Sequence, residues 1–200
     1  MKNILASPAR SLALGLAISL AILIVWIVGS GVDRIGFTSF VLRWVHIFAG
    51  MIWIGMIWFV NFIQLVAVAE AEGPARAGIM KHIVPRVAHT FRHASHWTMG
   101  SGVLLLITSG YLLDRLVFSS PVYIPPMRNL LLWGGTLAAL AMYGFVHMVI
   151  WPGLRIVLGL EPADADKIAA ARARVAVYAR WNLILAVPVT VAMVAAAHLY

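Results

Sequence analysis

Long runs without a charged residue alternate with short polar connections along this chain of 200 residues. A helix needs about 20 consecutive apolar residues to cross a bilayer, and five runs approach or exceed that length. The basic residues flank these runs, as they do around membrane spans. The pattern predicts five transmembrane helices, over about 11–29, 40–69, 95–113, 129–154 and 181–200.

The connection at 162–180 predicts an amphipathic helix on the inner side of the membrane. Pro162 stands at the expected helix start, Asp164 and Asp166 lie in the first turn, and basic residues follow. This order matches the helix dipole, and we expect the helix to continue directly into the fifth span. Because the spans leave no room for a separate soluble core, we expect one all-α membrane domain over 1–200.

The distribution of lysine and arginine predicts the orientation. If the N-terminus is cytoplasmic, eleven of the 15 basic residues lie inside and four outside. This bias follows the positive-inside rule, so the C-terminus is expected in the periplasm of a bacterial cytoplasmic membrane. The four outer residues are Arg34, Arg43, Arg115 and Arg128.

The composition restricts which partners and cofactors the chain can bind. The chain is 62% hydrophobic and 11% charged, and its net charge of +8 comes from residues that flank the spans, so we set nucleic-acid binding aside. It contains no cysteine, which excludes disulfides, iron–sulfur clusters, thiolate zinc sites and covalent c-type haem attachment. A bound cofactor must therefore be held by nitrogen or oxygen ligands.

Four of the seven histidines fall inside predicted spans, where a buried imidazole needs a partner. His46 and His198 lie in the expected outer leaflet, and His96 and His147 in the inner leaflet. Two histidines at each depth are typical of a b-type cytochrome that carries electrons across a membrane through two haems. We therefore predict one or two haem b groups with these four histidines as candidate ligands. The alternative is that each imidazole bonds to a neighbouring helix.

A second histidine series precedes the third span. His82, His89, His93 and His96 would share one face of a continuous helix, and their spacing can ligate a metal. Pro85 argues against continuity through His82. For His82 and His89 the alternative is a basic helix along the lipid headgroups; His93 stays a candidate haem ligand and His89 a weaker one.

Polar residues also gather at the expected inner boundary. They predict a pocket for a substrate or quinol, although solvation of the membrane interface is an alternative use. The candidates are Asn61, Gln64, Arg92, Arg180 and Asn182.

Four stretches carry a resemblance to a known family. The segment from Trp44 to Gln64 reads WVHIFAGMIWIGMIWFVNFIQ, and it is followed by FRHASHWTMGSG from Phe91, MVIWPGLRIVLG from Met148 and ARVAVYARWNLILAVPVTVAMVAAAH up to His198. In order and spacing they resemble the membrane domain of bacterial membrane-bound urate oxidase (urate hydroxylase). A looser similarity, through W-x-H followed by W-x-G, is to haem-binding membrane protoporphyrinogen oxidases.

The resemblance implies a haem-containing membrane module in which His46 and His198 fall on the family pattern. The urate enzymes carry a c-type cytochrome domain, which this cysteine-free sequence lacks. His89, His93 and His96 also stand where mainly aromatic residues are expected in those enzymes. The resemblance therefore implies a stand-alone module that passes electrons to a separate cytochrome or larger redox complex, rather than urate oxidation.

Three functions remain open from the sequence. The first is electron transfer by haem b between a substrate or quinol and an external acceptor, either as an oxidoreductase or as a redox subunit. The second is a non-catalytic transmembrane subunit of a respiratory or photosynthetic assembly, or a homo-oligomer, with structural histidines. The third is a transition-metal site built on His89, His93 and His96.

Overall fold

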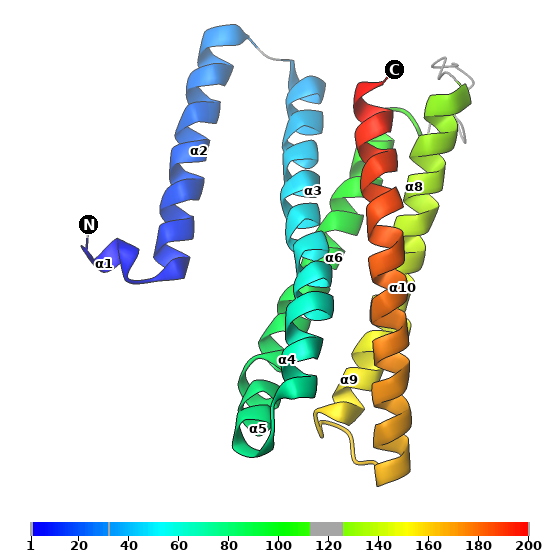
Figure 1. The fold of residues 1–200 in the computed structure, drawn as a ribbon. Helices are drawn as coiled ribbons and strands as arrows, with labels where there is room; N and C mark the ends of the chain where they lie inside the picture. The colour runs from blue at the N-terminus through cyan, green and yellow to red at the C-terminus, as the bar shows by residue number, and fades with distance from the viewer. Residues whose placement is uncertain (1, 32, 113–125, 200) are drawn as a thin grey trace. The chain divides into compact units, whose positions relative to one another are not determined.

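The computed structural model describes residues 2–31, 33–112 and 126–199, and the side chains at 2, 3 and 35 fall outside the description. Every regular element within these ranges is a helix, which confirms the all-α prediction. Contacts divide the chain into one unit at 1–40 and a second at 41–200, where the sequence predicts a single domain. Figure 1 shows the helices of both units.

The first unit consists of α1 (Lys2–Leu5), α2 (Pro8–Ser30) and the beginning of α3 (Arg34–Phe59). Pro8 suits the first turn of α2, where its missing N–H costs no hydrogen bond. The helix ends at Gly31, whose φ of 61° is left-handed and whose N–H bonds to the Ile27 carbonyl. No residue of α2 is buried, so its apolar side chains suit contact with lipid.

One long helical segment begins the second unit. There α3 continues without a break through the π-helix η1 (Val60–Gln64) into α4 (Leu65–Glu70). The short α5 (Gly73–His82) then packs against α6 (Val84–Thr108). The break between α5 and α6 confirms the prediction that Pro85 prevents one continuous helix from including His82.

The remaining helices form the other side of the second unit (Figure 1). They are α8 (Pro126–Gly144), the π-helix η2 (Phe145–Ile150), α9 (Trp151–Val157) and α10 (Ala165–His198), and α10 packs along the other three. The predicted inner helix and fifth span are indeed one helix. It begins at Ala165 rather than near Pro162, because the Asp164 carboxylate accepts a hydrogen bond from the Lys167 N–H at 2.7 Å and caps it.

Four helical segments of the described chain are long and apolar enough to cross a membrane: Pro8–Ser30, Gly36–Glu70, Pro126–Val157 and Ala165–His198. The third predicted span corresponds to α6, which has 25 residues but carries three histidines and two arginines in its first half. It begins and ends earlier than predicted, and Leu113 lies outside the described residues. The chain is thus a multi-pass helical membrane protein, and its described residues contain four apolar spans and the long, more polar helix α6.

The core of the second unit is built from one face of each long helix. Trp53 and Ile57 of α3 meet Met142 of α8 and Val146 of η2, and all four are at most 2% exposed. Phe91 and Ala94 of α6, Ala139 of α8, and Ala186 and Val189 of α10 complete this core. The shared core fixes the helices that carry the histidines and the polar cluster.

Candidate functional site

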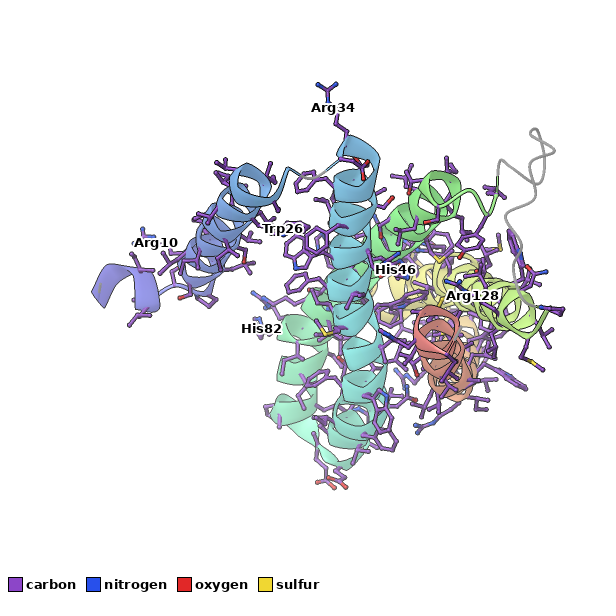
Figure 2. All side chains as sticks on the ribbon, turned by 90° about the horizontal axis from the view of Figure 1, so that it is seen from above. Arg10, Trp26, Arg34, His46, His82 and Arg128 are labelled. Atoms are coloured by element: carbon purple, nitrogen blue, oxygen red, sulfur yellow. The ribbon has the colours of Figure 1, made fainter. Side chains whose placement is uncertain are left out.

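His46 of α3 is held against α6 by a backbone carbonyl. Its Nδ1 lies 2.9 Å from the carbonyl oxygen of Thr98, and Figure 2 labels the residue within the side chains of the second unit. Because a carbonyl can only accept, Nδ1 carries the hydrogen and the lone pair of the neutral ring lies on Nε2. This is the orientation that ligating histidines commonly have, with one nitrogen bonded to a carbonyl and the other free for a metal.

Gly102 provides the space for that ring. A Cβ placed on Gly102 would lie 2.9 Å from Cε1 and 3.1 Å from Nδ1 of His46, which is closer than carbon atoms pack. Gly100 lies two residues earlier, about 200° around the helix from Gly102, and a Cβ placed on it would meet nothing within 4 Å. The absence of a side chain at Gly102 therefore lets α3 and α6 approach at His46.

His198 is the last helical residue of α10 and is exposed. Among the described residues, no hydrogen bond or ring contact joins it to His46. Their pairing as outer haem ligands stays a prediction.

A row of aromatic rings runs from α6 to η2, and we call it the histidine row: His89, His93, His96, Tyr143 and His147. The rings of His89 and His93 lie 4.2 Å apart between centroids, and those of His96 and His147 lie 4.3 Å apart. The Tyr143 hydroxyl is 2.8 Å from Nδ1 of His96, and its ring is 4.2 Å from that of His147. The three histidines of α6 are exposed, whereas His147 and Tyr143 are half-buried.

Ser95 fixes the tautomer of His147. The single hydroxyl hydrogen of Ser95 is donated to the Arg92 carbonyl at 2.7 Å, so its oxygen accepts from Nε2–H of His147 at 3.1 Å. The lone pair of His147 is therefore on Nδ1. His147 lies in η2, which ends two residues before Pro152. In a regular α-helix the proline ring would clash with the carbonyl four residues earlier, and the wider π-turn relieves that conflict.

The contact between His96 and His147 limits what they can ligate together. Atoms in contact are about 3.5–4.0 Å apart, so rings with centroids 4.3 Å apart have no porphyrin between them. In this arrangement the pair does not occupy opposite faces of one haem, although either ring can approach a group bound beside it. Within residues 2–31, 33–112 and 126–199, no three histidine or acidic side chains are placed to hold a metal ion, so the transition-metal alternative has no complete ligand set there.

Asn61 connects η1 to α10. Its Nδ2 donates to the Ile57 carbonyl at 2.9 Å and to the Ala179 carbonyl at 3.3 Å, while its Oδ1 accepts from Nη1 of Arg180 at 2.8 Å. A side chain that bonds the carbonyl four residues earlier competes with the regular α-helical ladder. This accounts for the π-helical turn that begins at Val60.

A cavity of about 250 Å³ lies between η1, α4, α5, α6, α9 and α10, and we call it the amide cavity. Its walls are mainly aliphatic, with the amides of Asn61, Gln64 and Asn182 as polar groups and Arg76 and Arg172 as charged ones. Asn182 is 1% exposed, and neither its Oδ1 nor its Nδ2 has a hydrogen-bond partner. Gln64 is 8% exposed, and its Oε1 also has none.

The polar cluster expected at the inner boundary thus divides in the structure. Asn61, Gln64 and Asn182 line the amide cavity, and Arg180 supports it through Asn61. Arg92 instead lies over the Trp151 ring at 4.5 Å, and its buried Nε has no partner.

Other residues of these sites were not among the sequence candidates. Tyr143 precedes His147 by one helical turn, a spacing that could have linked the two. Arg76 and Arg172 belong to connections between the predicted spans, where basic residues are expected to face the headgroups. A single sequence does not show that a glycine is required at position 102. Only the packing of α3 on α6 reveals why a glycine is needed there.

Comparison of the chain with protein-family models, curated proteins and solved structures finds no match. The resemblance to the membrane domain of urate oxidase therefore stays a prediction.

Proposed function

We propose that the chain is a membrane-embedded b-type haem protein that transfers electrons between a lipid-soluble substrate or quinol and an external acceptor or larger redox complex. The observation that carries the proposal is the hydrogen bond from His46 Nδ1–H to the Thr98 carbonyl. It leaves Nε2 free in a ring that is fixed in direction and partly buried.

The residues around His46 fit this assignment. Thr98 holds the ring orientation, and Gly102 removes the side chain that would displace the ring. Haem would supply one-electron chemistry between its ferric and ferrous states. His46 is the proposed axial ligand, with His198, His96, His147 and His93 as candidates for further ligation and His89 as a weaker one.

The proposed membrane arrangement has five spans, with α6 as the third. Eleven basic residues on one side against four on the other support an inside N-terminus and a periplasmic C-terminus in a bacterial cytoplasmic membrane. Part of the polar surface of α6 is hydrogen-bonded within the second unit, at Ser95, His96 and Thr98, which supports its place as a span.

A second candidate function is a transmembrane subunit of a larger assembly, with a cytochrome, a redox complex or a second copy as partner. It is favoured by the exposed side of the histidine row, where His89, His93 and His96 face outward from α6. Three exposed imidazoles are unfavourable against hydrocarbon and suit a protein or cofactor surface. This role is compatible with haem binding.

The test is the haem content of two histidine variants, measured as the pyridine haemochrome per chain in detergent. His46→Ala should reduce haem b at least tenfold, while His82→Ala, on the exposed end of α5, should retain the wild-type amount. Equal haem in wild type and His46→Ala, with both inserted in the membrane, would remove His46 as a ligand.

A further inference from the structure

We infer that the amide cavity is a binding site for a quinone or quinol head group, with Asn182 and Gln64 as its hydrogen-bonding partners. The inference assigns a ligand class to the redox protein proposed above, but it stands on the cavity and concerns binding alone. Binding of the ligand is therefore measured separately from haem content.

The unpartnered amide of Asn182 is the first argument. Buried polar groups are nearly always hydrogen-bonded, and an unbonded one costs about 1–3 kcal/mol. Asn182 leaves both a donor and an acceptor unpaired at 1% exposure. Rotation of the amide by 180° does not change this, because both atoms lack partners.

Gln64 extends the same polar end of the cavity. Its Oε1 adds a second unpaired acceptor, whereas both polar atoms of the neighbouring Asn61 are already bonded, to Ile57, Ala179 and Arg180. The free groups are thus one amide donor and two amide acceptors. A quinone carbonyl can accept from the donor, and a quinol hydroxyl can donate to either acceptor.

The walls and the volume of the amide cavity suit the hydrophobic ring of a quinone. Aliphatic side chains such as Val84, Val87, Leu154 and Val175 form most of the lining, which suits a hydrophobic ring and tail. A volume of about 250 Å³ holds a compact ring rather than a full lipid. The lining residues come from several helices, including η1, α4, α5, α6, α9 and α10, so the site is a partly open cavity between helices rather than a groove along one of them.

An anionic amphiphile such as a fatty acid fits less well. Arg76 and Arg172 line the cavity but are exposed, so they mark its open end. A carboxylate held there would leave Asn182 and Gln64 unpaired deeper inside. A carboxylate beside Asn182 would meet two amide oxygens without a buried positive charge among the cavity-lining residues.

The test is the binding of decyl benzoquinone to the full chain in nanodiscs. Binding is measured as saturable quenching of tryptophan fluorescence, after the signal of empty nanodiscs is subtracted. Wild type should saturate, and Asn182→Leu, which keeps the branching at Cγ but removes both polar atoms, should weaken binding about tenfold. Gln64→Leu should weaken it by a smaller factor and serves as the second variant if Asn182→Leu does not fold. Asn129→Leu is the matched control, because Asn129 has a buried unpartnered Oδ1 in α8 but does not line the cavity.

Several results would overturn the inference. These are an absence of saturable binding to wild type, or wild-type affinity in folded Asn182→Leu and Gln64→Leu. Saturable binding of decanoate that displaces the quinone would assign the cavity to an anionic amphiphile if two further results accompany it. Decanoate binding would then be lost in Arg76→Gln and Arg172→Gln but kept in Asn182→Leu. Haem content measured on the same samples separates these outcomes from failure of the proposed function.

Discussion

His46 and the histidine row place imidazoles in the same helical unit in two different ways. His46 is a single ring held by a backbone carbonyl of a neighbouring helix, in a space cleared by Gly102. In the histidine row the rings contact one another and are held by side chains, as His96 is by Tyr143 and His147 by Ser95. A ring fixed by the backbone keeps one nitrogen directed and free, whereas stacked rings fill the space that a planar cofactor would need.

The largest effect is expected from Gly102→Ala. The new Cβ would lie 2.9 Å from His46 Cε1, so either the ring or the helix pair must move. We expect loss of most bound haem and destabilisation of about 1–3 kcal/mol, the usual cost of overpacking. Haem per chain measures the loss of haem, and the free energy of unfolding in detergent measures the destabilisation.

Gly100→Ala is the control, because its Cβ would meet nothing within 4 Å. Haem content should stay at the wild-type level in this variant. If both alanine variants lose haem equally, the clearance at Gly102 is not what positions His46.

A smaller effect is expected from Ser95→Ala. It removes the acceptor of His147 Nε2–H, and a lost hydrogen bond of this kind costs about 0.5–1.5 kcal/mol. The free energy of unfolding should fall by that amount, and haem content should stay at the wild-type level. Ser101→Ala is the matched control, since the Ser101 hydroxyl bonds only to carbonyls of its own helix. If haem content also falls in Ser95→Ala, the histidine row belongs to the haem site and does not differ from His46 in function.

The smallest effect is expected from His89→Ala. Its ring is exposed and lies at the end of the row against His93, so the free energy of unfolding should change by about 0.5 kcal/mol or less. Haem content should be unchanged. A clear loss of haem would instead move ligation toward α6.

Much of the fold could be predicted because hydrophobic length is a local property. The first and fourth spans differ from the helical segments Pro8–Ser30 and Pro126–Val157 by a few residues at each end. The start of α6 differs from the prediction because its polar first half is helical through contacts with neighbouring helices. The start of α10 depends on the Asp164 cap rather than on Pro162.

The π-helical turns could not be predicted, although both carry candidate residues. In η1 the Asn61 side chain bonds both the Ile57 carbonyl of its own helix and the Ala179 carbonyl, which lies far along the chain. Depth in the membrane suggested that His96 and His147 lie at one level, and the structure brings them together. Depth alone gave no information about ring orientation, which determines what can bind between them.

Haem binding by His46 is tested most directly by a dithionite-reduced minus oxidised absorption spectrum of the wild-type chain, purified after expression with ample haem. We expect the Soret and α bands of haem b, in at least one equivalent per chain and dependent on His46. A protein that is inserted and folded but shows no haem bands would exclude the haem role and leave the transmembrane-subunit role in its place.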